Sequence, residues 1–242
     1  MQSFFISKTH SMHSTIDLTS QDGTKIPAYV ARPQGIPRAA VVVLQEIFGV
    51  NSHIKAVADG YAAAGYYAVA PHMFHRVQAG VDLGYTDADM QAAFALKGAS
   101  EQIKDKLMQD IQAAINHASG LVAGSETGGK VAVTGFCLGG LLTWRAASQL
   151  SGVAAAVPYY GGGMHHELGA TLRCPTMAHL SDNDSYLPMD GVAALQAAHP
   201  EVQVHLYSAH HGFNCDQRGS YQAEAAALAK QRTLDFLAEH LS

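Results

Sequence analysis

Short apolar runs that alternate with helical stretches are the feature that most restricts how this chain can fold. The runs at residues 39–44, 66–70 and 131–134 consist almost entirely of apolar and β-branched residues, without a polar residue at every second position. Strands that are apolar on both faces belong in a sheet that is covered on both sides. Helical patterns separate the runs, so the order predicts an α/β fold: a mostly parallel sheet of about seven to eight strands with helices on both faces.

The start of the chain departs from this pattern. Thr15–Leu18 and Ile26–Ala31 are typical of an antiparallel pair, because Asp22-Gly23 between them is a hairpin turn signal. Residues 1–13 are expected to form a loose polar leader. A long helical pattern covers residues 88–118, with Gly98 as the expected break into two helices. No shift in composition and no repeat marks a boundary, so residues 1–242 are expected to form one domain.

Composition excludes several classes of protein. Hydrophobic residues make up 48% of the 242 residues and charged residues 14%, which is enough apolar material for a substantial core. The formal net charge is −5 and no basic stripe occurs, so we expect no nucleic-acid partner. No run reaches the roughly 18 apolar residues of a membrane span. Three scattered cysteines do not suit a disulfide framework, which favours a cytoplasmic location. We expect a monomer or a small homo-oligomer.

A cysteine flanked by glycines stands at the end of the third of these runs. Gly135, Cys137 and Gly139 have the G-x-nucleophile-x-G spacing of a nucleophile elbow, with cysteine in place of the usual serine. A sharp strand-to-helix turn strains the backbone at the nucleophile and brings neighbouring chain close to both flanking positions, which therefore require glycine. A lone cysteine at such a joint is also commonly a small buried hydrophobe, so the motif alone leaves catalysis open.

Groups that can act with a thiol nucleophile follow it at two later strand ends. Asp182 and Asp184 come after the strand that ends at Leu180, and a pair of histidines, 210 and 211, comes after the strand that ends at Tyr207. The chain order nucleophile, acid, base is that of α/β-hydrolases. Because the carboxyl ends of parallel strands meet at one edge of the sheet, the sequence predicts a catalytic triad there, with either aspartate and either histidine.

These motifs together resemble the dienelactone hydrolase family, and the resemblance extends over most of the chain. The matching segments are Gln-Glu-Ile-Phe-Gly-Val-Asn at 45–51, Gly-Phe-Cys-Leu-Gly-Gly at 135–140, Asp-Ser-Tyr-Leu-Pro at 184–188 and Ala-His-His-Gly-Phe at 209–213. The resemblance implies the α/β-hydrolase fold. It selects Asp184, which precedes x-x-Leu-Pro, and His211, which directly precedes Gly-Phe.

The resemblance also implies an activity and further site residues. Cys137 is expected to cleave an ester or lactone through a thioester acyl-enzyme, with Asp184 orienting His211. Glu46 is expected to interact with the resting thiol and to help generate the thiolate. The backbone N–H groups of Ile47 and Leu138 are the expected oxyanion hole.

No metal and no organic cofactor is expected. The pairs His165-His166 and His210-His211 do not suggest a metal site, because neighbouring side chains of an extended chain point to opposite sides.

The expected substrate contacts depend on the same resemblance. Arg76 matches a family arginine that pairs with the substrate carboxylate. The family's dienelactone-cleaving members carry a second arginine four residues after the catalytic histidine, where this chain has Cys215, and Arg218 is only nearby. Strict dienelactone specificity is therefore in doubt. The candidate residues for the pocket wall are Phe48, Phe74, Tyr85 and Phe213.

Three other functions compete with this hypothesis. A general carboxylesterase or thioesterase would use the same triad. A non-catalytic α/β-hydrolase-like protein would use the pocket to hold a small ligand, although all three triad positions are present. A redox-responsive cysteine protein would need a resolving cysteine near Cys137, and the chain has Cys174 and Cys215 but no C-x-x-C.

Overall fold

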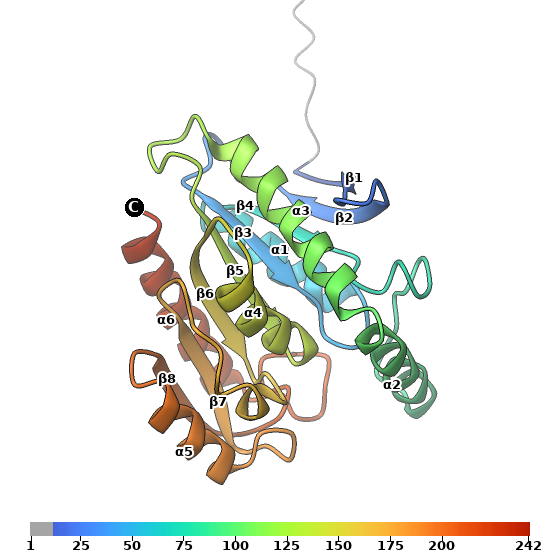
Figure 1. Cartoon of the computed structure of the whole chain (residues 1–242), viewed down its shortest axis with the longest axis vertical. Coiled ribbons are helices and arrows are strands. Elements are labelled where there is room, and N and C mark those ends of the chain that lie inside the picture. The colour runs from blue at the N-terminus through green and yellow to red at the C-terminus, as the bar shows by residue number, and fades with distance from the viewer. Residues whose placement is uncertain (1–11) are drawn as a thin grey trace, which may run out of the picture.

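An eight-stranded sheet forms the centre of the computed structural model, which describes residues 12–242 (Figure 1). The strand order is β1-β2-β4-β3-β5-β6-β7-β8. The strands are β1 (His13–Thr19), β2 (Lys25–Ala31), β3 (Ala40–Leu44), β4 (Tyr67–Pro71), β5 (Val131–Phe136), β6 (Val153–Tyr159), β7 (Met177–Asn183) and β8 (Gln203–His210). The leader expected at 1–13 lies almost wholly outside the described residues, and His13 already begins β1.

Strand direction follows the sequence prediction. β1 pairs with β2, and β2 with β4, in antiparallel register. From β4 to β8 every pairing is parallel. The central strands β3, β4 and β5 are buried along their whole length, which explains their unbroken apolar sequence. The predicted fold class and the antiparallel pair at the start are confirmed.

Helices cover both faces of this sheet. They are α1 (Ser52–Ala63), α2 (Asp87–Glu101), α3 (Lys104–Val122), α4 (Leu138–Gln149), α5 (Met189–Ala198) and α6 (Ala223–His240). α1 and α6 pack on one face, and α3 and α4 pack on the other (Figure 1). Val42 and Val133 point into the core under α3, whereas Val41 and Val43 point into the core under α1 and α6.

The break in the long helical pattern does not lie at Gly98, contrary to the prediction. Gly98 lies inside α2, and the chain breaks at Gln102 and Ile103, between α2 and α3. A Cβ atom at Gly98 would meet nothing within 4 Å, so this glycine is neither a turn nor a close approach. The prediction was wrong because glycine lowers helix propensity by only about 1 kcal/mol, which the flanking alanine-rich turns offset.

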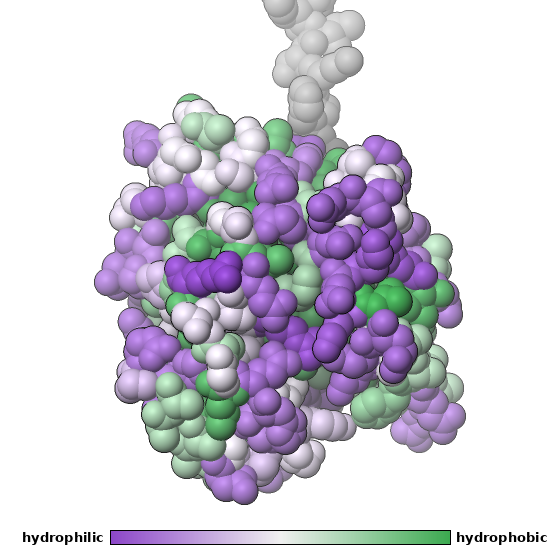
Figure 2. Space-filling model, in the orientation of Figure 1, coloured by the Kyte–Doolittle hydropathy of each residue, from purple (hydrophilic) through white to green (hydrophobic). Residues whose placement is uncertain are grey.

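The surface is mostly hydrophilic on the face that Figure 2 shows, with smaller apolar areas between the polar side chains. Among residues 12–242, no helix is both long enough and apolar enough to cross a membrane. The parallel strands β3, β5, β7 and β8 all end at the same edge of the sheet. The segments that follow them carry the predicted triad, Glu46 and the predicted oxyanion-hole residues, whereas Arg76 and Tyr85 follow β4.

Candidate active site

Cys137 occupies the sharp turn between β5 and α4. Its backbone has φ 56° and ψ −113°, a conformation that residues other than glycine rarely adopt. Its N–H donates to the carbonyl of Tyr159 at 3.1 Å, and its own carbonyl accepts from Gly140 and Leu141, the first turn of α4. A strained residue held by such bonds is typical of a functional site.

The glycines around Cys137 are required by contact. A Cβ atom at Gly135 would collide with the carbonyl oxygen of Gly139, and one at Gly139 would collide with that of Leu44. A Cβ at Gly140 would lie 2.5 Å from the carbonyl oxygen of Tyr159. The start of α4 is therefore pressed against the ends of β3 and β6, and this packing fixes the position of the sulfur.

Asp184 and His211 form a buried pair. Asp184 Oδ2 lies 2.8 Å from His211 Nδ1, and the two side chains are 1% and 9% exposed. Asp184 Oδ1 accepts the Tyr186 N–H at 2.8 Å, which fixes the carboxylate from its other side. Asp182 and His210 are both exposed, and Asp182 Oδ1 accepts a backbone N–H from Ala209. The geometry thus favours the same aspartate and histidine as the family resemblance.

The other nitrogen of the His211 ring faces the cavity that Cys137 lines. Nε2 is buried and has no hydrogen-bond partner among residues 12–242. Burial lowers the pKa of His211, but the charge of Cys137 and the bond with Asp184 outweigh it and raise the pKa to about 10. A histidine held by a carboxylate on Nδ1, with Nε2 free beside a thiol, can exchange a proton with that thiol or with a bound water. Hydrogen bonds of this kind are often long without substrate.

A cavity of about 520 Å³ lies in front of the sulfur, and Cys137 and His211 both line it. Ile47 and Leu138, the predicted oxyanion-hole residues, line the same cavity. Leu138 is the first residue of α4, where an N–H has no preceding turn to bond to, and the helix N-terminus favours negative charge.

Glu46 is 1% exposed and lies at the end of β3, but it is paired with a different residue than expected. Its Oε1 lies 3.3 Å from Arg218 Nη1, and Oε2 is buried without a hydrogen-bond partner in the described chain. No hydrogen bond or ion pair joins Glu46 to Cys137 within residues 12–242. Arg218 lines the cavity and packs over the Phe48 ring, 5.6 Å from its centroid.

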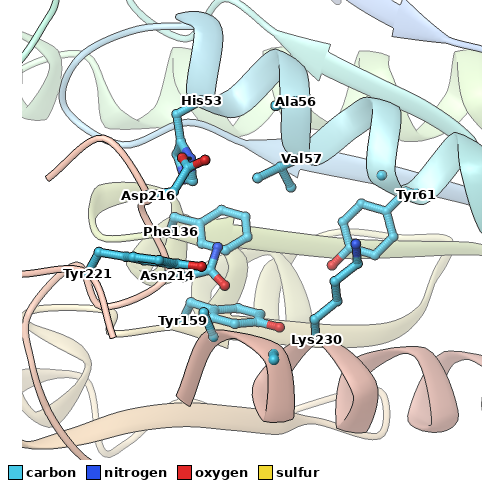
Figure 3. A pocket seen from close by; sticks show the side chains of 13 residues that line it. His53, Ala56, Val57, Tyr61, Phe136, Tyr159, Asn214, Asp216, Tyr221 and Lys230 are labelled. Carbon is cyan, nitrogen blue, oxygen red and sulfur yellow. Dashed lines mark ion pairs between the residues drawn. The ribbon is translucent and has the colours of Figure 1, made fainter. Parts of the chain in front are cut away.

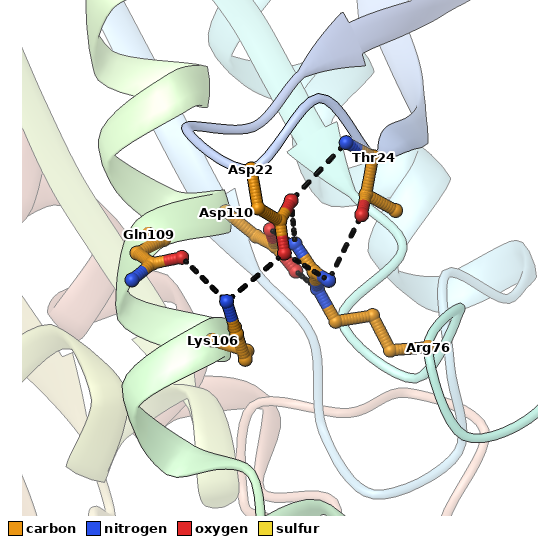
Figure 4. Close-up of polar contacts among 6 residues, drawn as sticks. All are labelled: Asp22, Thr24, Arg76, Lys106, Gln109 and Asp110. Atoms are coloured by element: carbon orange, nitrogen blue, oxygen red, sulfur yellow. Dashed lines mark hydrogen bonds and ion pairs between the residues drawn. The ribbon is translucent and has the colours of Figure 1, made fainter.

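The structure corrects the expectation for Arg76. Figure 4 shows its guanidinium between Asp22 and Asp110, under the β1–β2 turn. Arg76 Nε and Nη2 bond both oxygens of Asp110 at 2.7 and 2.8 Å, and Nη1 bonds Asp22 at 3.0 Å. These carboxylates raise the pKa of Arg76, and Arg76 in turn lowers the pKa of Asp22. Arg76 is not among the residues that line the cavity, and its hydrogen bonds join the β1–β2 turn to α3.

The aromatic candidates separate into two groups. Phe48 lines the cavity, whereas Phe74, Tyr85 and Phe213 do not. Phe74 and Phe213 are fully buried core residues, and Phe213 packs on Tyr160 and Tyr207. Tyr85 lies behind Phe48, with ring centroids 4.6 Å apart, and its hydroxyl accepts from Asn51 and Cys215. Their expected place in the pocket wall is corrected accordingly.

Sequence reasoning missed three side chains beside the site. Tyr160 and Tyr186 place their rings against His211, with centroids 5.1 and 4.7 Å away. Arg145 lines the cavity and bonds Glu101 and Glu167. The helical spacing 138, 141, 145 puts Arg145 on the same face of α4 as Leu138, so this signal was available. Tyr186 belongs to the Asp-Ser-Tyr-Leu-Pro segment that matches the family, so its position was also a signal, whereas nothing in the sequence points to Tyr160.

Comparison with known proteins gives a consistent picture. The profile of the dienelactone hydrolase family matches residues 26–241. A carboxymethylenebutenolidase from Pseudomonas putida is 34% identical, over 92% of this chain and 95% of its own length. One from Pseudomonas knackmussii matches to the same extent.

Solved structures share the architecture. The crystal structure of a proposed dienelactone hydrolase from Klebsiella pneumoniae subsp. pneumoniae is 28% identical, has a TM-score of 0.79, and is matched over 94% of this chain and 98% of its own. An esterase from Pyrococcus furiosus is 14% identical with a TM-score of 0.68, over 95% of this chain and 93% of its own. The second likeness concerns the fold alone.

Proposed function

This chain belongs to the dienelactone hydrolase family, and from that premise we propose that it hydrolyses a carboxylic ester or lactone with Cys137 as the nucleophile. The observation that carries the proposal is the arrangement of three groups. A strained cysteine and the free Nε2 of His211 meet at one cavity, and Asp184 holds the opposite nitrogen of that ring.

The first half of the proposed reaction forms a thioester. The Cys137 thiolate attacks the carbonyl carbon, and the backbone N–H groups of Ile47 and Leu138 stabilise the oxyanion. The C–O bond then breaks, and the leaving alkoxide or enolate departs, with a proton from His211 where it needs one. The charge of the Cys137 thiolate and the bond with Asp184 raise the pKa of His211, so once the thiolate has formed the ring is protonated and can give that proton.

The second half restores the enzyme. Once the sulfur is acylated it carries no charge, and the pKa of His211 falls because the negative charge of Cys137 no longer raises it. The neutral ring then takes a proton from water at Nε2, and the hydroxide attacks the thioester carbonyl. The C–S bond breaks, so the carboxylic acid product leaves and the Cys137 thiolate is restored beside the imidazolium. Asp184 keeps the ring in the orientation that both steps need.

We propose that Arg218 binds the carboxylate of an acidic substrate. Arg145 already pairs with Glu101 and Glu167 at 3.1 and 2.7 Å, whereas Arg218 has one longer contact, 3.3 Å to Glu46. A substrate carboxylate at Arg218 would compete with Glu46. Glu46 would then be released to act on the thiol. In this proposal Arg218 binds the substrate carboxylate, as the arginine that Cys215 replaces is expected to do in other family members.

The test compares a carboxylate-bearing lactone with a neutral aryl ester. Cys137→Ala is expected to abolish hydrolysis of both, and trapping with hydroxylamine should detect the thioester only in the wild type. Arg218→Ala should raise KM for the acidic lactone at least tenfold and for the neutral ester by less. Undiminished turnover by Cys137→Ala would overturn the nucleophile.

The competing functions make different predictions in the same assay. A non-catalytic ligand-binding protein would show no burst of leaving group with any substrate. A general carboxylesterase would prefer the neutral ester, and its KM would not respond to Arg218→Ala.

A further inference from the structure

Behind the cavity, three side chains from distant parts of the chain meet in the core. Glu46 follows β3, His53 belongs to the first turn of α1, and Cys215 lies in the loop after β8. One donor atom from each residue lies within 4.8 Å of the other two, and all three residues are buried. The triad accounts for Cys137, Asp184 and His211, but it gives no role to His53 or Cys215.

Two of these side chains carry a buried polar atom that no hydrogen bond satisfies. Glu46 Oε2 and His53 Nε2 have no partner among residues 12–242, and the two residues are 1% and 3% exposed. Buried polar groups are nearly always hydrogen-bonded, so each exception requires a reason. A carboxylate oxygen, an imidazole nitrogen and a thiol sulfur within 4.8 Å of one another are a set of metal ligands.

We propose that Glu46, His53 and Cys215 bind a divalent transition-metal ion of the Zn²⁺ class, and that its binding switches hydrolysis off. Imidazole and thiolate ligands favour Zn²⁺ or Co²⁺ over Mg²⁺ and Ca²⁺, which prefer oxygen ligands alone. On binding, Cys215 releases its thiol proton to solvent, and the carboxylate, thiolate and neutral imidazole balance the charge of the ion. Three protein ligands leave a fourth position for water.

Neighbouring side chains support each ligand. The Tyr85 hydroxyl lies 3.2 Å from Cys215 Sγ and is fixed by Asn51 Nδ2 at 3.0 Å, so it can donate to the sulfur once the thiol proton is lost. Asp216 lies 3.5 Å from His53 Nδ1 and can hold the ring with Nε2 directed at the ion. Carboxylates beside the far nitrogen of a metal-bound histidine are common in such sites.

In this proposal the ion approaches His53 from a second cavity, and not from the catalytic one. A second cavity of about 250 Å³ lies between α1 and α6, and His53, Asn214 and Asp216 line it (Figure 3). Asp216 is 64% exposed and supplies a negative charge at its edge. The ion would enter past Asp216 and exchange water for the side chains of the site.

The consequence for catalysis rests on the proposed function. A metal ion that holds Glu46 removes the carboxylate that is proposed to act on the Cys137 thiol. It also weakens the pair between Glu46 and Arg218, which lines the catalytic cavity. Binding itself does not depend on the hydrolytic mechanism, so it is tested first and separately.

The binding test uses the full chain with Cys137→Ser, which removes the catalytic thiol as a competing ligand. Titration with Co²⁺ should give one equivalent of tight binding and a thiolate-to-metal absorption band in the near ultraviolet, and Zn²⁺ should displace it. Adding Cys215→Ser should abolish the band and weaken affinity at least tenfold. Adding Cys174→Ser, the matched control, should change neither. His53→Gln should weaken binding to a similar extent.

The fold of each variant is checked by circular dichroism and a thermal melt without metal. Zn²⁺ should raise the Tm of the Cys137→Ser protein and leave that of the Cys137→Ser/Cys215→Ser protein unchanged, since a ligand stabilises only the state that binds it. No Co²⁺ binding by the Cys137→Ser protein, or equal binding by the Cys215→Ser double variant, would overturn the site.

The inhibition test uses the protein with Cys137 intact. Zn²⁺ should inhibit ester hydrolysis, and its inhibition constant should rise at least tenfold in Cys215→Ser and remain the same in Cys174→Ser. An unchanged constant in Cys215→Ser would overturn the inhibitory role. If the wild type hydrolyses no ester at all, the proposed function fails, and the binding titration still decides the site.

Discussion

The pKa of His211 is shifted by the groups that surround its ring. It is nearly buried, yet its pKa is raised, because the charge of Cys137 and the bond with Asp184 outweigh the cost of burial. The folded pKa of about 10 lies above the ordinary value of 6.5. Protonated His211 therefore stabilises the fold below pH 6.5, and that contribution is lost as the pH rises toward 10.

Removing the thiol should lower the pKa of His211. In Cys137→Ala the largest raising contribution disappears, while burial still lowers the pKa and Asp184 still raises it. The pKa should fall clearly below the wild-type value, which titration of the imidazole resonances by NMR measures. Asp182→Asn is the matched control and should leave it unchanged. An unshifted pKa in Cys137→Ala would show that the sulfur does not act on the ring.

Removing the Arg76 side chain should lower the free energy of unfolding. Arg76→Ala leaves the Asp110 carboxylate, which is 1% exposed, without its cation, and loss of one partner of a buried pair costs about 3 kcal/mol. Urea unfolding should show that loss. Lys55→Ala, which breaks the exposed pair with Asp82, should cost less than about 1 kcal/mol. Full stability of Arg76→Ala, combined with a raised KM, would restore its role in substrate binding.

Among the elements, the β5–α4 turn is the one whose geometry the sequence predicted most fully. Its glycines are required by contacts of Gly135 with Gly139, and of Gly139 and Gly140 with the ends of β3 and β6. Steric requirements of this kind can be recognised in the sequence as glycines at fixed spacing. The α2–α3 break has no such glycines, since it falls at Gln102 and Ile103 while Gly98 lies on an open helix surface. Local propensity predicts turns that need glycine better than turns that tertiary packing imposes.

Adding a methyl group tests this turn directly. Gly139→Ala would push a Cβ into the carbonyl oxygens of Leu44 and Gln45, so we expect a loss of at least about 3 kcal/mol or no folded protein. Gly120→Ala in α3 meets nothing within 4 Å and should stabilise the fold by up to about 1 kcal/mol. Urea unfolding of both variants measures the difference. Equal stability would mean that the turn is looser than described.

At the scale of the whole molecule, the features that the sequence did not predict are contacts between segments far apart in the chain. Because Cys137, Asp184 and His211 each follow a parallel strand, the sequence predicted that they meet at one edge of the sheet. The choice of Asp184 over Asp182, and of His211 over its neighbour, needed the family resemblance. Arg76 was misplaced because its partner Asp110 is 34 residues away and carries no motif. The cluster of Glu46, His53 and Cys215 was missed for the same reason.

The three cysteines should differ in reactivity. Cys137 lines an open cavity, Cys215 is fully buried, and burial raises the pKa of Cys174 to about 11, which keeps its thiol protonated near neutral pH. Iodoacetamide at pH 7.5 should therefore modify Cys137 first, as peptide mass spectrometry would show. Hydrolysis should be lost in step with that modification. Comparable labelling of Cys174 would contradict this order.

The three groups of the proposed triad follow β5, β7 and β8, so more than seventy residues separate Cys137 from His211 along the chain. A polypeptide still emerging from the ribosome thus carries the sulfur long before the imidazole that would activate it. Hydrolytic competence would arise only when β8 has joined the sheet. Turnover would then require the complete sheet, and a product truncated before β8 would be inactive.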